Sequence, residues 1–175
     1  VGQTAFERND LATAAAALGR YMEHSRTLVE REPGNAEFQR ELSYAYSNLG
    51  TLARERRRPG EALAHFESGA VIEQRLLVAK PDDADLRYSL AESHSWAGTC
   101  LLDLGRLDDS EQSFVRALGL LGALHRKGGN PRYSEEYADV GALLAGVLAN
   151  RGEAGRAVAQ LEESNSVYAA LTRHD

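Results

Sequence analysis

The chain has 175 residues, of which 43% are hydrophobic, 26% charged and 7% aromatic, a composition typical of a folded domain and too apolar for a disordered one. Its formal net charge of −6 argues against nucleic acid or an anionic membrane surface as the main partner, because both require a basic face. The single cysteine excludes an intrachain disulfide framework, and no apolar run approaches the roughly 18 residues that a membrane span needs.

Apolar residues at steps of three and four predict helices along the whole chain, and no stretch alternates as a strand would. Pro59 suits the first turn of one helix, and Asp83 is a plausible N-cap for the next. The sequence therefore predicts an all-α fold of about seven long helices after an N-terminal stub at 1–8. The predicted helices cover residues 10–32, 36–57, 60–79, 84–104, 107–127, 133–151 and 153–173.

A repeat of 48 residues runs through the sequence. Shifting the chain by this length superposes four glycines, Gly2, Gly50, Gly98 and Gly146, together with apolar residues between them. We expect one array over residues 1–175, with units at about 1–33 (partial), 34–81, 82–129 and 130–175. Val1 aligns with the middle of a first helix, so we also expect the chain to be a fragment of a longer protein.

The recurring glycines are expected to mark the contact between the two helices of each hairpin. A glycine inside a helix costs roughly 1 kcal/mol relative to alanine, so it persists where two backbones approach closely. Small residues of the second helix should face these glycines, and bulky residues should wedge between neighbouring units. The small residues are Ala14, Ala62, Ser110 and Ala157, and the bulky ones are Leu18, Phe66, Phe114 and Leu161.

The pattern of each unit resembles the tetratricopeptide repeat, in which a bulky residue precedes a Leu-Gly pair and an alanine and a phenylalanine follow in the second helix. Three copies are present: Tyr46-x-x-Leu49-Gly50-x-x-Ala53 with Ala62-x-x-x-Phe66, His94-x-x-Ala97-Gly98-x-x-Leu101 with Ser110-x-x-x-Phe114, and Ala142-x-x-Ala145-Gly146-x-x-Ala149 with Ala157-x-x-x-Leu161. The units are longer than the common 34-residue repeat and look like the long arrays found in bacterial signalling proteins.

The resemblance implies a right-handed solenoid of antiparallel helical hairpins that binds a protein or peptide in its concave groove without catalysing a reaction. First-helix residues should line this groove as partner-binding residues: Arg40, Tyr44, Ser47, Asn48, Thr51, Tyr88, Glu92, Ser95, Trp96 and Thr99. Ser47 and Ser95 stand where a carboxylate clamp would need basic or amide side chains, so that type of groove is set aside.

Two alternatives stay open for these surfaces. Trp96, the only tryptophan, either packs between neighbouring first helices or anchors a peptide. The corresponding row of the last unit is apolar, and we expect further chain or a second subunit to cover it, which makes a homodimer possible. That row consists of Val140, Leu143, Leu144 and Val147.

No residue constellation indicates catalysis, a metal or a cofactor. The five histidines share no helical i, i+3 or i, i+4 spacing, and Cys100 is expected to be a buried small residue. The basic run from Arg54 to Arg58 is read as a solvated turn, with a phosphate or acidic-partner site as the alternative. We therefore expect a cytoplasmic interaction module with a protein or peptide partner, and no binding to nucleic acid or membrane.

Overall fold

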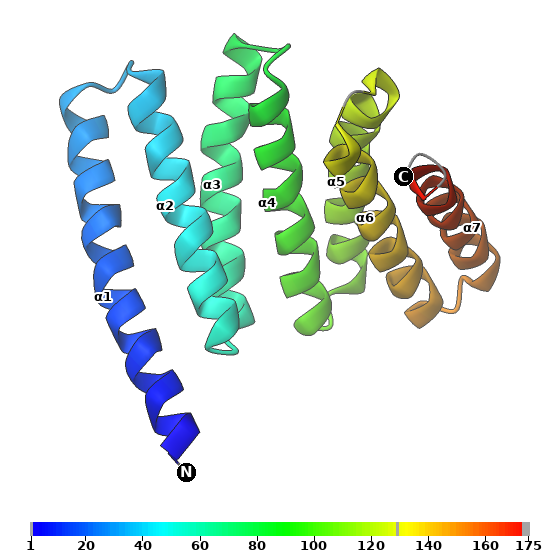
Figure 1. Cartoon of the computed structure of the whole chain (residues 1–175), viewed down its shortest axis with the longest axis horizontal. Helices are drawn as coiled ribbons and strands as arrows, with labels where there is room; N and C mark the ends of the chain where they lie inside the picture. Colours follow the sequence, from blue (N-terminus) through cyan, green and yellow to red (C-terminus); the bar gives the residue numbers. More distant parts are fainter. Residues whose placement is uncertain (1, 129, 173–175) are drawn as a thin grey trace.

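The chain folds into seven α-helices joined by short turns, and the described residues contain no β-strand (Figure 1). The computed structural model describes residues 2–128 and 130–172, with side chains from residue 10 onward in those ranges. The helices are α1 (Gly2–Arg31), α2 (Ala36–Glu55), α3 (Pro59–Ala79), α4 (Ala84–Asp103), α5 (Leu107–Lys127), α6 (Pro131–Asn150) and α7 (Ala154–Leu171). The predicted all-α class is confirmed. The predicted stub is not separate, because α1 is continuous from Gly2.

Consecutive helices stand side by side in chain order, from α1 at one end of the molecule to α7 at the other (Figure 1). Each helix packs mainly on the helices before and after it, and α4 also contacts α6. A row of hairpins that contact only their neighbours is the architecture of a helical-repeat solenoid. The first helices of the complete hairpins are α2, α4 and α6, and the second helices are α3, α5 and α7.

Side-chain caps begin the first helix of each complete hairpin. Asn35, Asp83 and Asn130 each accept a hydrogen bond from a backbone N–H of the following turn. Such caps satisfy amide groups that have no partner within the helix. The predicted cap at Asp83 is confirmed, and Pro59 lies in the first turn of α3 as expected.

Two of the recurring glycines form the expected contact within a hairpin. A Cβ added at Gly50 would lie 2.8 Å from the ring of Phe66, and one added at Gly98 would lie 2.9 Å from the ring of Phe114. The residue nearest to each glycine is thus the phenylalanine, and not the small residue, Ala62 or Ser110, that the sequence predicts to face it. Ser110 adds a hydrogen bond from its hydroxyl to the Gly98 carbonyl, at 2.8 Å. A larger residue at either glycine would force a buried ring to move.

The last hairpin breaks this pattern, and the expectation for it is wrong. Gly146 has open space around it, and Leu161 is 42% exposed instead of wedged between units. A different glycine, Gly141, forms the close contact here, lying against Ser164 of α7. Gly2 lies in α1, but its surroundings fall outside the described side chains.

The core is a series of apolar clusters between adjacent helices. One cluster joins α2, α3 and α4 through residues that include Phe66, Ala97 and Cys100. A larger cluster extends from α4 to α7 and includes Phe114 and Leu121. The faces of α2 and α4 that remain outside these clusters frame the site described next.

Candidate functional site

A small cleft lies between α2 and α4, with α3 as its floor. Its volume is about 200 Å³. Six of the ten predicted groove residues line it: Tyr44, Ser47, Asn48, Thr51, Glu92 and Trp96. Phe66, Glu73, Ser89 and Ser93 complete the lining. The first helices of two successive hairpins therefore bring these side chains to one place.

Trp96 forms one wall of this cleft. Its ring stacks on Phe66 of α3, with centroids 6.3 Å apart, and the guanidinium of Arg54 lies 4.1 Å from its centroid. The side chain nevertheless keeps 40% of its surface exposed. Both readings from the sequence thus apply in part, because Trp96 is packed between helices and still presents an edge to solvent.

Glu73 lies at the floor of the cleft, and the sequence reasoning did not find it. Its side chain is 1% exposed, and a carboxylate oxygen accepts a hydrogen bond from the Ser93 hydroxyl at 2.8 Å. Burial raises the pKa of Glu73 to about 7, although the hydrogen bond from Ser93 opposes this rise. The sequence did contain one signal for this residue, because Glu73 stands on the inward face of a second helix, where an apolar residue is expected.

Tyr88, a predicted groove residue, lies in a second cluster between α4 and α6. Its ring is 6% exposed and lies 5.5 Å from the ring of Tyr133. Arg132 also packs on the Tyr88 ring, with its guanidinium 4.3 Å from the ring centroid. The same guanidinium lies 3.5 Å from a carboxylate oxygen of Glu92. Tyr88 also donates a hydrogen bond to Glu136 at 3.4 Å. This second inter-hairpin surface is therefore filled by its own side chains.

Three carboxyl groups on α3, α4 and α6, those of Glu73, Glu92 and Glu136, have raised pKa values. Burial raises the pKa of Glu92, against the hydrogen bond from Tyr88 and the charge of Arg132. Burial also raises the pKa of Glu136, with further contributions from the charges of Glu92 and Asp139. Ionisation of Glu73, Glu92 or Glu136 thus carries a cost in solvation.

The remaining three predicted groove residues, Arg40, Ser95 and Thr99, do not line this cleft. Arg40 forms an ion pair with Asp83 at 2.9 Å and so ties α2 to the N-cap of α4. A backbone hydrogen bond from Leu86 and this guanidinium hold the pKa of Asp83 below its ordinary value. Ser95 is buried at 6% exposure, and Thr99 donates to its carbonyl at 3.1 Å.

The apolar row of the last unit does not need an external cover, and that expectation is corrected. Val140 and Val147 are fully buried, Leu144 is 4% exposed, and only Leu143 is exposed, at 38%. The three buried residues belong to the cluster that spans α4 to α7. They are buried because α6 packs directly against α4 and α5, so the array itself covers the row.

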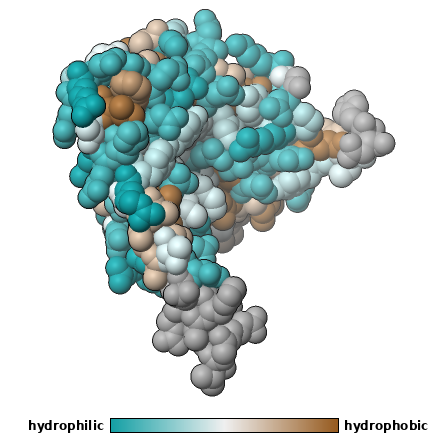
Figure 2. Space-filling view, turned by 60° about the vertical axis from the view of Figure 1, so that its left-hand side comes forward, coloured by the Kyte–Doolittle hydropathy of each residue, from teal (hydrophilic) through white to brown (hydrophobic). Residues whose placement is uncertain are grey.

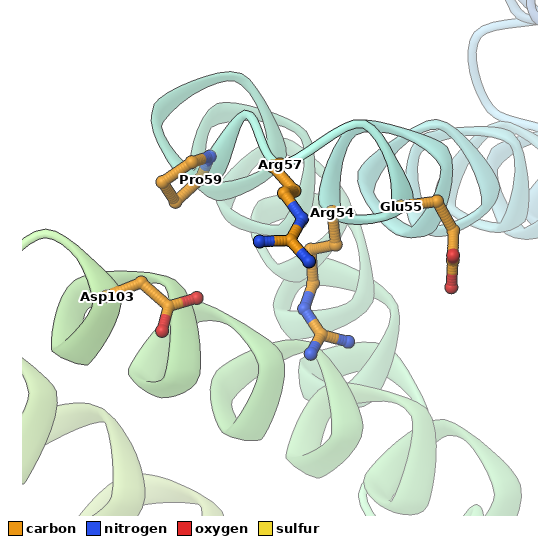
Figure 3. Close-up of a pocket in the computed structure, with 5 residues that line it drawn as sticks. All are labelled: Arg54, Glu55, Arg57, Pro59 and Asp103. Carbon is orange, nitrogen blue, oxygen red and sulfur yellow. The ribbon is translucent and has the colours of Figure 1, made fainter. Parts of the chain in front are cut away.

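A second cleft of about 550 Å³ lies at the carboxyl ends of α2 and α4. Figure 3 shows Arg54 and Arg57 on the side that faces Asp103, with Glu55 projecting on the other side of α2. Two basic and two acidic side chains line this cleft, so its charges offset one another.

The face shown in Figure 2 is mainly hydrophilic, with smaller apolar patches. The described residues contain no group of three or more side chains that could hold a metal ion. Cys100 is buried as expected, and burial raises the pKa of its thiol to about 11. Among the helices described, none is long and apolar enough to cross a membrane.

Comparison with solved structures finds one chain whose fold is similar over most of this chain. The chain is similar to BtubC (BKLC) from P. vanneervenii, with 20% identity and a TM-score of 0.67 over 93% of this chain; it spans 58% of the length of that chain. It also aligns with the structure described as MamA MSR-1 C2, with 18% identity and a TM-score of 0.36 over 97% of this chain and 98% of that one. No protein-family model and no curated protein matches the sequence. The likeness to BtubC supports the helical-repeat fold alone.

Proposed function

We propose that residues 1–175 form one array that binds a peptide segment of a partner protein, without catalysis, and that the α2–α4 cleft is the main contact. The observation that carries this proposal is the convergence of an exposed tryptophan edge, Tyr44 and several polar side chains in that cleft. Aromatic side chains that are rigid and partly exposed are common anchors of protein interfaces. Polar groups beside them can fix the register of a bound backbone.

The α2–α4 cleft is better suited to this role than the neighbouring inter-hairpin surface. Tyr88 is covered by Tyr133 and Arg132, so a partner would have to displace both. Asn48 and Thr51, in contrast, lie exposed at the rim of the open cleft. A peptide can reach this cleft without rearranging the fold.

The test starts from peptides selected against the chain by surface display. Replacing Tyr44 and Trp96 together by alanine should lower the affinity of the chain for the selected peptides at least about tenfold, because the aromatic contact area is lost. The matched control replaces Val71 and Val115, which are 53% and 50% exposed on the second helices, by alanine. Circular dichroism should show that all variants remain helical.

A second variant guards against unfolding caused by the loss of the Trp96 packing. Asn48→Tyr places a ring at the rim of the cleft, where the side chain is exposed, and should block it without removing a packed residue. Undiminished binding by both folded variants would refute the groove assignment.

A further inference from the structure

The fold does not require a carboxylate at the position of Glu73. One repeat earlier the same position holds Ser25, and one repeat later it holds Leu121. All three side chains are buried, with 1%, 1% and 0% exposure for Ser25, Glu73 and Leu121. The repeat is therefore compatible with a small or an apolar residue here, and the glutamate is an exception to the pattern.

Burying this carboxylate carries a free-energy cost that the surroundings do not offset. Its hydrogen-bond donor is the neutral hydroxyl of Ser93, and the charge that acts on its pKa is that of Glu92. No basic side chain lines the cleft in the described part of the chain. A buried carboxyl group either keeps its proton or is paired with a cation, so the ionised form of Glu73, at the floor of an open cleft, is suited to a charge partner that comes from outside.

The neighbouring inter-hairpin surface already contains the arrangement that such a partner would make. There the guanidinium of Arg132 lies over the ring of Tyr88 and beside the carboxylate of Glu92. The α2–α4 cleft offers similar elements, with Tyr44 and Trp96 as rings and Glu73 and Glu92 as carboxylates. Arg54 lies over the Trp96 ring at the edge of the cleft, but no basic side chain lines the cleft beside Glu73. Guanidinium groups favour this combination because they stack on rings and bond to carboxylates through a planar fork.

The size of the cleft limits the ligand to about one side chain. Its volume of about 200 Å³ lies below the roughly 300 Å³ at which pockets for drug-sized molecules begin. A long, narrow cationic side chain can enter it with its aliphatic part against the rings. A terminal carboxylate would instead be repelled by the two glutamates.

On this basis we propose that the α2–α4 cleft accepts one arginine side chain of the bound peptide, with Glu73 and Glu92 as its counter-charges. This proposal rests on the proposed function of the concave groove and adds the chemical class of its ligand. Lysine should bind more weakly than arginine, because an ammonium group can neither stack in the same way nor form the planar fork.

The test uses capped pentapeptides with a central arginine, lysine or citrulline between alanines, where citrulline is the neutral analogue of arginine. Each is titrated at millimolar concentration into the isotope-labelled chain. The sequence contains one tryptophan, so one indole N–H signal reports on the cleft. The arginine peptide should bind at least about tenfold more tightly than the citrulline peptide, as expected for hydrogen bonds to a charged group.

The matched variants are Glu73→Gln and Glu67→Gln. The first keeps an acceptor for the Ser93 hydroxyl and removes the charge, and it should abolish most of the preference for arginine. The second removes a charge from an exposed residue of the same helix, outside the cleft, and should leave the preference unchanged. Glu92→Gln should reduce the preference less than Glu73→Gln, because Glu92 already has Arg132 as a partner.

Equal affinities for arginine and citrulline, or an unchanged preference in Glu73→Gln, would overturn the proposal. If arginine is not preferred while display-selected peptides still require Tyr44 and Trp96, the basic ligand is refuted and the groove function stands. If the selected peptides do not require these residues, both are refuted.

Discussion

The two inter-hairpin surfaces of the array, α2–α4 and α4–α6, are built from equivalent repeat positions but differ in how they are filled. At α4–α6 the floor residue is Leu121, and Tyr88 is covered by its neighbours. At α2–α4 the floor residue is Glu73, and a cleft remains open. The contacts within the hairpins, Gly50 with Phe66 and Gly98 with Phe114, are the same in both. The comparison separates positions that make the fold from positions that are free to acquire a function.

The largest expected effect comes from the shared hairpin contact. Phe66 and Phe114 are 1% and 0% exposed, so replacing either by alanine should lower the free energy of unfolding by about 3–5 kcal/mol. Only Phe66→Ala should also change the tryptophan fluorescence of the folded protein, because Trp96 stacks on Phe66. Denaturant unfolding followed by circular dichroism and by fluorescence measures both effects. A similar fluorescence change in Phe114→Ala would show that the two surfaces are not independent.

The next effect is the pH dependence of the free energy of unfolding that Glu73, at the α2–α4 surface, causes. The pKa of Glu73 is about 7 in the folded chain, whereas the ordinary value for a glutamate is 4.5. The folded state therefore binds the proton more tightly than the unfolded state does. The contribution of Glu73 to stability is therefore largest below pH 4.5 and is lost as the pH rises to about 7. The loss amounts to about 3 kcal/mol at most, at 1.36 kcal/mol per pKa unit.

Glu73→Gln tests this directly, because it retains the acceptor for Ser93 and cannot ionise. The variant should be more stable than the parent chain at pH 8, and this advantage should shrink as the pH is lowered. The titratable groups that share the cleft are Tyr44 of α2 and Glu92 of α4, and both are present in the parent and the variant. A stability difference that stays constant with pH would mean that Glu73 does not carry an elevated pKa in the folded chain.

Much of the fold could be predicted from the sequence because helical periodicity, proline and the repeat report on local contacts. The helices from α2 to α7 begin and end within two residues of the predicted bounds. The failures include the N-terminal stub, which is part of α1, and the last unit, where Gly146 and Leu161 match the repeat in position but not in environment. A repeat pattern gives the position of a residue along its helix, but not how the helices of the final hairpin pack, and this packing decides what each residue contacts.

The candidate site could be predicted only in part, for a related reason. First-helix positions identified Tyr44, Asn48 and Trp96, since their phase on the helix places them between hairpins. Glu73 was missed because it belongs to a second helix and reaches the cleft from beneath. Arg132 was missed because its partners, Tyr88 and Glu92, lie in the preceding hairpin.

The most direct test of the central claim is to locate a display-selected peptide on the chain by isotope-filtered nuclear Overhauser measurements. If the α2–α4 cleft is the binding site, the bound peptide should show contacts to the Trp96 indole and the Tyr44 ring. These contacts should be lost in Asn48→Tyr. Contacts confined to residues of the opposite face, such as Val71 and Val115, would contradict the account.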